Sequence, residues 1–238
     1  MPSFLDALRA AGLPLIMEVK TRDPHGGDLL GGRGVAEVVR AYEAAGAPCV
    51  SVVTGRWFGG TTALLREVAG LTGLPLLQKD FITRHDQVTA ARDLGASAVL
   101  LTAGLLTTSA LGRLTGAALD AGLTPFVEVT TEQEIESLPY ADRCAVAVNN
   151  KDIKQRERDA PRLDRSRALL PALTAAGVGC PVSASGIEDP ADAADLLARG
   201  YGGLLVGTSL LRRSDPVAWA TEVALHRSRL MAGNTEHP

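Results

Sequence analysis

The feature of this chain that most constrains its fold is a repeated alternation of short apolar runs with amphipathic stretches along its whole length. Parallel strands joined by crossover helices produce this pattern, and strands buried on both faces read as nearly continuous apolar runs. We count eight such pairs. The expected strands are Leu15–Lys20, Cys49–Val53, Leu76–Lys79, Ala98–Thr102, Pro125–Val129, Ala145–Val148, Pro181–Ser183 and Gly203–Val206.

The amphipathic stretches predict the helices that connect these strands. Several of them are followed directly by a glycine, which is typical of a helix that ends in a left-handed cap. The expected helices are Ala36–Ala45, Thr62–Leu71, His85–Leu94, Ser109–Ala121, a short one at Glu132–Ser137, Arg165–Ala176, Pro190–Arg199 and Pro216–Leu230, with one more, Ser3–Ala11, before the first strand.

Eight strand–helix units in 238 residues fit a single (β/α)8 barrel, a fold that typically needs ~250 residues. A doubly wound open sheet is the alternative, but it usually has fewer strands and leaves no place for the last ones. We therefore predict an α/β protein in which residues 1–238 form one (β/α)8 TIM-barrel catalytic domain with a short N-terminal helix. The Gly-rich segment Thr21–Gly34 after the first strand is a candidate lid.

Charge and cysteine usage exclude several classes of function. The formal net charge is −3 and no Lys/Arg block is interleaved with aromatic residues, so nucleic acid is not an expected partner. The three cysteines form no CxxC pair, and the four histidines show no close ligand spacing, so neither a disulfide framework nor a metal site is expected. No apolar run is long enough to span a membrane, and a cytoplasmic protein is expected.

Charged and polar side chains gather at the carboxyl ends of the expected strands. In a barrel these ends meet at one mouth, which holds the active site. The residues at these ends are Glu18 and Lys20, Lys79 and Asp80, Glu128, Asn149 to Lys151, and Ser183 to Gly186.

Glu18, Lys20 and Lys79 are the first candidates for acid–base chemistry. Glu18 and Lys20 are two residues apart on a strand and so face the same side, either as pocket residues or as a structural ion pair that caps the core. Lys79 ends an apolar strand, where an ammonium group is costly unless something at the mouth pairs with it. Asp80 is interpreted as a carboxylate that orients Lys79 or a loop.

Glu128 and Asn149 extend this set. Glu128 is flanked by apolar residues, where desolvation raises a carboxyl pKa into the range of a general acid or base. A buried structural partner for a lysine is the alternative. Asn149 fits either a loop cap or a hydrogen-bonding group for substrate.

Two further groups indicate how a substrate is held. Ser185 and Gly186 follow the seventh strand, and Gly207 and Thr208 follow the eighth, where barrels commonly bind phosphate. Ordinary turn glycines are the alternative. Phe58, before a Gly-Gly pair, offers an aromatic surface for a substrate, or packs under a loop.

The order of these motifs resembles the indole-3-glycerol phosphate synthase family, a ring-closing and decarboxylating barrel enzyme of tryptophan biosynthesis, from the first strand to the last. The most specific motif is Lys79-Asp80-Phe81. The others are Glu18-Val19-Lys20, Phe58-Gly59-Gly60, Val127-Glu128-Val129, Asn149-Asn150-Lys151-Asp152, Ser183-Ala184-Ser185-Gly186-Ile187 and Val206-Gly207-Thr208-Ser209.

The resemblance implies a lyase that acts on 1-(2-carboxyphenylamino)-1-deoxyribulose 5-phosphate with no metal or organic cofactor. Lys79 would then protonate the keto oxygen, Lys20 would assist near the substrate carboxylate, and Glu128 would act in the later dehydration. Glu18 and Asn149 would hold substrate hydroxyls. Substrate binding would fall to Phe58, Phe81, Lys151, Ser185, Gly186, Gly207 and Thr208. The expected partner is a small phosphorylated substrate, and the expected state is a monomer or a weak homo-oligomer.

Three departures from the family pattern lie inside the expected site. Ala184 stands where the family usually has a glutamate, and Lys151 stands where it has an arginine. Asp23-Pro24-His25 replaces a Ser-Pro-Ser sequence near the phosphate, and Asp23 would repel a phosphate unless it is paired or turned away.

These departures keep other functions open. One is a paralogue that acts on a different carboxylated or phosphorylated ketose-like substrate in a secondary pathway. Another is a different barrel chemistry, such as isomerisation of a phosphorylated aminosugar. The third is a non-catalytic barrel that binds a phosphorylated metabolite.

Overall fold

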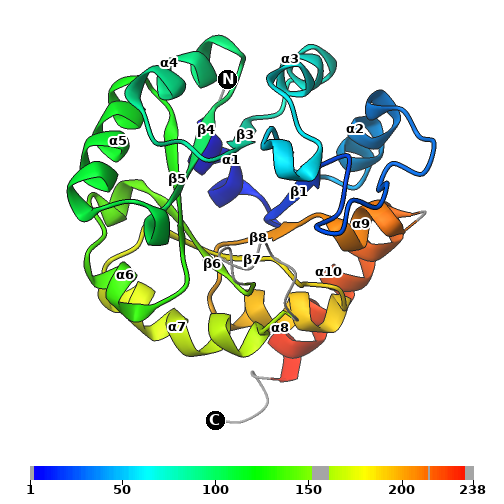
Figure 1. Ribbon diagram of the computed structural model, residues 1–238. Coiled ribbons are helices and arrows are strands. Elements are labelled where there is room, and N and C mark those ends of the chain that lie inside the picture. Colours follow the sequence, from blue (N-terminus) through cyan, green and yellow to red (C-terminus); the bar gives the residue numbers. More distant parts are fainter. Residues whose placement is uncertain (1–2, 152–160, 214, 234–238) are drawn as a thin grey trace.

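The chain forms a closed barrel of eight parallel strands in sequence order, surrounded by helices (Figure 1). This is a (β/α)8 barrel, as the alternation in the sequence predicts. The computed structural model describes residues 3–151, 161–213 and 215–233. The strands are β1 Leu15–Val19, β2 Cys49–Val53, β3 Leu76–Lys79, β4 Ala98–Thr102, β5 Thr124–Val129, β6 Ala145–Asn149, β7 Cys180–Ala184 and β8 Gly203–Val206.

Helices follow the strands and cover the outside of the barrel. They are α2 Val35–Ala44, α3 Thr62–Leu71, α4 His85–Asp93, α5 Thr108–Asp120, α6 Glu132–Glu136, α7 Leu163–Ala175, α8 Pro190–Arg199, α9 Thr208–Arg212 and α10 Pro216–Gly233, and α1 Phe4–Ala10 precedes β1. Short 3-10 turns are η1 Arg56–Phe58, η2 Ala103–Leu105 and η3 Ala141–Arg143. Only α9 was not expected as a separate helix, because its five residues follow β8 almost directly.

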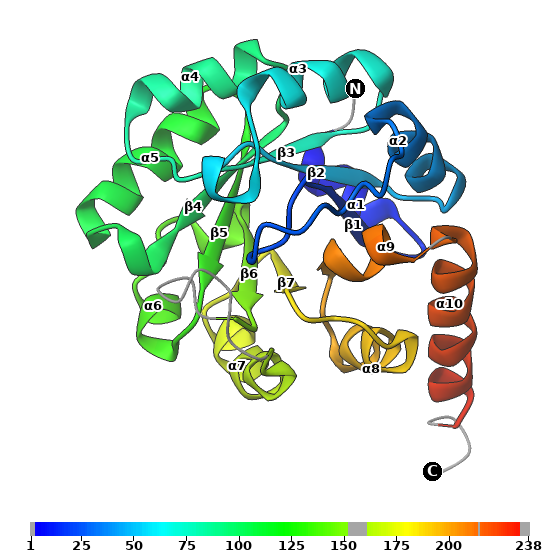
Figure 2. The same ribbon diagram turned by 45° about the vertical axis from the view of Figure 1, so that its right-hand side comes forward.

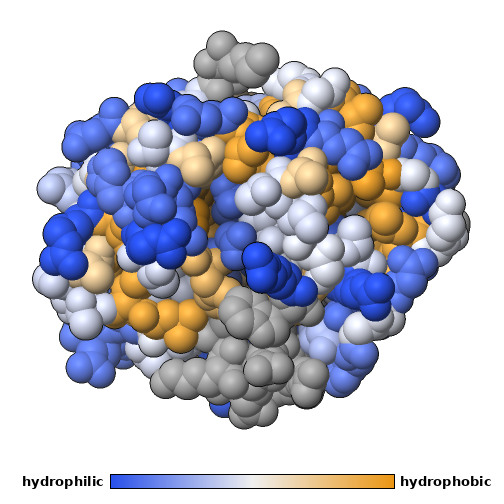
Figure 3. Space-filling view, turned by 45° about the horizontal axis from the view of Figure 1, so that its top comes forward, coloured by the Kyte–Doolittle hydropathy of each residue, from blue (hydrophilic) through white to orange (hydrophobic). Residues whose placement is uncertain are grey.

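Most of the buried apolar side chains form a shell between the strands and the outer helices. This shell explains the continuous apolar runs, because a strand that contacts helices on one face and the barrel interior on the other has no polar face. On the face seen in Figure 3, hydrophobic residues form patches between hydrophilic ones. Among the described helices, none is both long and apolar enough to cross a membrane.

A second apolar cluster fills the barrel interior and is closed at one end by α1. Phe4 of α1 is fully buried, and its ring contacts Phe126 of β5 edge to face, with centroids 6.2 Å apart. Leu8 packs so closely on β8 that a Cβ at Gly203 would lie 2.9 Å from its Cδ2 atom. The helix therefore seals the amino-terminal end of the barrel, and the carboxyl ends of the strands form the open mouth.

Glycines in the left-handed conformation follow five of the ten described α-helices, as the sequence predicts. The glycine after α3, Gly73, does not act as such a cap, because the cap residue Thr72 has extended backbone and Gly73 is not left-handed. The glycines with positive φ after helices are Gly46, Gly95, Gly122, Gly177 and Gly200.

Candidate active site

The charged residues at the strand ends point into the barrel. Successive side chains of a strand point to opposite faces, so residues two apart share a face. Ile16 of β1 and Leu77 of β3 belong to the interior cluster. Glu18 and Lys79, each two residues further along, therefore face the interior near the mouth, together with Lys20 just beyond β1.

Glu18 joins both lysines. Its Oε1 lies 3.1 Å from Lys20 Nζ and its Oε2 lies 3.3 Å from Lys79 Nζ. The side chains of Glu18, Lys20 and Lys79 are 2%, 7% and 11% exposed, so the cluster is largely desolvated. Burial alone would raise the pKa of Glu18, but the two ammonium groups outweigh it and lower the pKa to about 2. Glu18 is therefore ionised at neutral pH.

A cavity of about 190 Å³, here called the loop cavity, opens beside this cluster. Its lining carries four cationic side chains and three carboxylates, an excess of positive charge that favours an anionic ligand. The loops after β7 and β8 form one wall. The lining residues used below are Lys20, Lys79, Lys151, Ser185, Gly186, Gly207, Thr208 and Arg212.

Backbone geometry brings these loops close to the cluster. Ser185 has a φ of 71°, a left-handed conformation that is uncommon for a residue with a side chain and that turns the chain sharply after β7. Gly207 lies against the cluster, since a Cβ there would come within 2.5 Å of Glu18 Oε1. A glycine is therefore required at 207 for this close approach.

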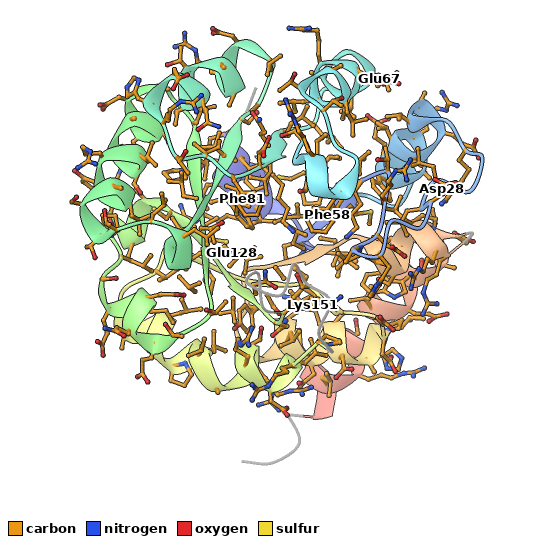
Figure 4. The ribbon with its side chains drawn as sticks, viewed as in Figure 1. Asp28, Phe58, Glu67, Phe81, Glu128 and Lys151 are labelled. Carbon is orange, nitrogen blue, oxygen red and sulfur yellow. The ribbon has the colours of Figure 1, made fainter. Side chains whose placement is uncertain are left out.

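A smaller cavity of about 30 Å³, here called the aromatic cavity, adjoins the same cluster. It shares Glu18, Lys20 and Lys79 with the loop cavity, and its other walls are largely apolar. Phe58 and Phe81 supply the aromatic walls, and the ring centroid of Phe58 is 5.8 Å from Lys20 Nζ. Figure 4 shows Phe58, Phe81, Glu128 and Lys151 around the centre of the strand ring, whereas Asp28 and Glu67 lie at its outside.

Glu128 and Asn149 lie on the interior faces of β5 and β6 but are not among the residues that line these two cavities. Glu128 is 1% exposed and pairs in register with Thr102. Asn149 is fully buried, and its Oδ1 accepts the backbone N–H of Lys151 at 2.9 Å, which shapes the chain as it leaves β6. Both side chains are therefore buried in the barrel interior, outside the lining of these two cavities.

Of the two roles considered for Asp80, orienting Lys79 or orienting a loop, the hydrogen bonds support the second. Its Oδ2 accepts the hydroxyl of Thr54 at 2.7 Å, and its Oδ1 accepts the backbone N–H of Phe81 at 2.8 Å. Gln78 Nε2 donates to the same Thr54 hydroxyl at 3.1 Å. Asp80 therefore joins the end of β3 to the segment after β2.

Asn150 has a structural role that its sequence position did not reveal. Its Nδ2 donates to Ser183 Oγ and to the carbonyl oxygens of Ala184 and Ser185, at 3.0–3.1 Å. Its Oδ1 accepts the hydroxyl of Ser166 at 2.8 Å. Asn150 thereby fastens the loop after β7 to β6 and α7. Asp152, the last residue of the same motif, lies outside the described residues.

Asp23 does not face the loop cavity as an unpaired charge. Its Oδ1 accepts the backbone N–H groups of His25 and Gly27, both at 2.9 Å, and its Oδ2 accepts Arg212 Nη2 at 2.8 Å. Sequence reasoning missed Arg212. Its spacing of four residues from Thr208 was an available signal, because residues four apart share one face of a helix.

A metal site was not expected, and the described part of the chain contains no group of three or more His, Cys, Asp or Glu residues placed to hold a metal ion. Its three cysteines are free and buried, and burial raises the pKa of the Cys49 thiol to about 12.

Solved structures with a similar fold include a 3-hexulose-6-phosphate synthase from Salmonella typhimurium, with a TM-score of 0.69 at 16% identity over 90% of this chain and 98% of that one. A mandelate oxidase variant gives a TM-score of 0.66 at 17% identity over 93% of this chain and 74% of that one. At such identities the likeness shows the barrel fold alone.

Sequence comparison is more specific. The family model described as indole-3-glycerol phosphate synthase matches residues 1–223. Proteins named indole-3-glycerol phosphate synthase include one from Opitutus terrae, 37% identical over 93% of this chain and 84% of its own length. Another, from Nocardioides sp., is 39% identical over 91% of this chain and 80% of its own length. This chain therefore belongs to the indole-3-glycerol phosphate synthase family.

Proposed function

We propose that the protein is a carboxy-lyase that closes the ring of 1-(2-carboxyphenylamino)-1-deoxyribulose 5-phosphate and releases carbon dioxide and water to give indole-3-glycerol phosphate. The observation that supports this most directly is the pair of adjoining cavities that share Glu18, Lys20 and Lys79. One cavity is cationic and the other has aromatic walls. Such a site suits a substrate with a phosphate at one end, an aryl ring at the other and a reactive carbonyl between them.

Lys79 is the proposed general acid. Lys79 forms an ion pair with Glu18 at 3.3 Å, and its ammonium group is able to give a proton to the keto oxygen as the aryl carbon attacks. Lys20 lies on the other oxygen of Glu18 and against Phe58, where it is placed to attract the ring carboxylate. Loss of carbon dioxide then returns the bonding electrons to the ring system.

Glu128 is the proposed group for the final dehydration, in which a proton is removed and water leaves as the pyrrole ring becomes aromatic. It is 1% exposed on the interior face of β5, and a carboxyl group can take up and release a proton as a general acid or base. Asn149 is proposed to hold substrate hydroxyls, and Lys151 the substrate carboxylate. Ser185, Gly186, Gly207 and Thr208 form the proposed phosphate site.

The direct test is to supply this substrate to the purified protein and to follow indole fluorescence together with release of carbon dioxide. The proposal predicts that both appear at equal rates. A folded protein that produces neither would contradict it.

One observation favours a second candidate, a paralogue that acts on another carboxylated ketose phosphate. Ala184 is 1% exposed on the interior face of β7, opposite Asn149 in register, so the mouth lacks a carboxylate at that position. This candidate predicts that the wild-type protein binds ribose 5-phosphate but does not turn over the carboxyphenylamino substrate. Gain of turnover in Ala184→Glu would then identify the missing carboxylate as the cause.

A further inference from the structure

The segment after β1 and the helix after β8 are joined at the rim of the loop cavity. Residues 20–34 and α9 lie side by side in both ribbon views (Figures 1 and 2). The side chain of Arg33 donates to the carbonyl oxygens of Leu29 and Leu211, and Arg212 donates to Asp23. Two arginines thus fasten this segment to α9.

Asp23 is built to hold a cation at this rim. It is 8% exposed and accepts two backbone N–H groups besides Arg212. Burial opposes its ionisation, but these three donors outweigh burial and lower the pKa of Asp23. The backbone folds tightly around it, since a Cβ at Gly27 would lie 2.9 Å from Asp23 Oδ2.

Arg212 has donors left for a ligand. A guanidinium carries five N–H groups, and the bond to Asp23 uses one terminal nitrogen. The side chain is 61% exposed and lines the loop cavity together with Ser185, Gly207 and Thr208. A guanidinium fixed on one side by a carboxylate and open on the other suits bidentate binding of a phosphate.

We propose that Arg212 binds the phosphate group of the substrate directly, and that Asp23 is the positioning residue that holds its guanidinium at the cavity. In this arrangement Asp23 favours phosphate binding, although it is an anion beside an anionic ligand. Its charge is neutralised by Arg212, and the bond to Asp23 restricts the motion of the Arg212 side chain. The identity of the substrate rests on the proposed function, whereas the binding of a phosphate monoester does not.

The test measures binding of ribose 5-phosphate, and of ribose as its neutral counterpart, by isothermal titration calorimetry. The Arg212→Gln variant should bind ribose 5-phosphate about tenfold or more weakly, the usual effect of losing charge-assisted hydrogen bonds. Affinity for ribose should not change. Arg213→Gln is the matched control, because the side chain of Arg213 donates only one long bond of 3.3 Å, to the Glu188 carbonyl, which Trp219 also binds.

Asp23→Asn distinguishes positioning from a purely structural role, because its effect should change sign. With Arg212 present, loss of the Asp23 charge frees the guanidinium and weakens ribose 5-phosphate binding. In the Arg212→Gln background the same change removes an unpaired negative charge beside the phosphate and strengthens binding. Weakening in both backgrounds would overturn the positioning role.

Direct binding by Arg212 is overturned if Arg212→Gln binds ribose 5-phosphate as tightly as the wild type does. It is equally overturned if Arg212→Gln and Arg213→Gln lower the affinity for ribose 5-phosphate by the same factor. It is also overturned if the wild-type protein does not prefer ribose 5-phosphate to ribose. Steady-state kinetics on the carboxyphenylamino substrate separate the two proposals. Binding that depends on Arg212 without turnover refutes the proposed function alone, whereas turnover with the same KM in Arg212→Gln refutes the role of Arg212 alone.

Discussion

Replacing Glu18 by glutamine tests the electrostatics of the site most sharply. The change keeps the size of the side chain but removes the charge that lies 3.1 Å and 3.3 Å from two ammonium groups. Lowering the pKa of a carboxyl group from 4.5 to about 2 corresponds to about 3 kcal/mol of folding free energy at neutral pH. For a chain of this size, that loss lowers Tm by about 6 to 12 °C.

The pH dependence of this effect has a fixed sign. The pKa of Glu18 in the folded state lies below its value of 4.5 in the unfolded state, so its contribution is complete above about pH 5 and is lost as the pH falls toward 2. The difference in Tm between wild type and Glu18→Gln should therefore be constant near neutrality and should shrink on acidification. Differential scanning calorimetry at pH 7 and between pH 3 and 5 measures it.

Glu67→Gln is the matched control, since Glu67 is exposed on the outside of the barrel (Figure 4). Its Tm should stay close to that of the wild type, as is usual for surface substitutions. A Glu18→Gln protein as stable as the Glu67→Gln protein at pH 7 would refute this reasoning, and so would a difference in Tm that does not shrink in acid.

Three other substitutions probe the closed end of the barrel and the two cavities. Gly207→Ala places a Cβ within 2.5 Å of Glu18 Oε1, so kcat/KM should fall by about tenfold or more. Circular dichroism should show that the barrel is still folded. Unchanged kinetics would contradict the requirement for a close approach at this position. Phe4→Ala leaves a cavity beside Phe126 and should lower the free energy of unfolding, measured by urea titration, by about 3 to 5 kcal/mol. Its kcat at 25 °C should be retained, because the mouth is at the other end of the barrel. Phe58→Ala removes an aromatic wall and should raise KM more than it lowers kcat, so an unchanged KM would count against an aryl subsite there.

Much of the fold could be predicted from the sequence, because the apolar runs that mark the strands are a direct consequence of burial on both faces. β2, β3, β4 and β8 begin and end at the predicted residues. α9 was missed because five residues show too little periodicity to be distinguished from a turn. The glycine content of residues 21–34 carries no information about the arginines that fasten this segment to α9.

Which candidate side chains lie together could be predicted where position on a strand decides orientation. Glu18, Lys20 and Lys79 meet because strand alternation and barrel closure bring them to one mouth. The partners of Asp23 and Asn150 could not be predicted, because their hydrogen bonds join residues far apart in the chain and depend on loop conformation. Because Asp23 pairs with Arg212, it is part of the cavity rim and not the unpaired charge that would repel a phosphate.

The central claim is that Lys79 is the general acid of ring closure, and the most direct measurement is the rate of indole-3-glycerol phosphate formation by wild type and Lys79→Ala at saturating substrate. Bound ribose 5-phosphate serves as the control for an intact site. The account predicts a fall in kcat of about 10²- to 10⁴-fold with ribose 5-phosphate binding retained. A Lys79→Ala protein that forms product within about tenfold of the wild-type rate would contradict it.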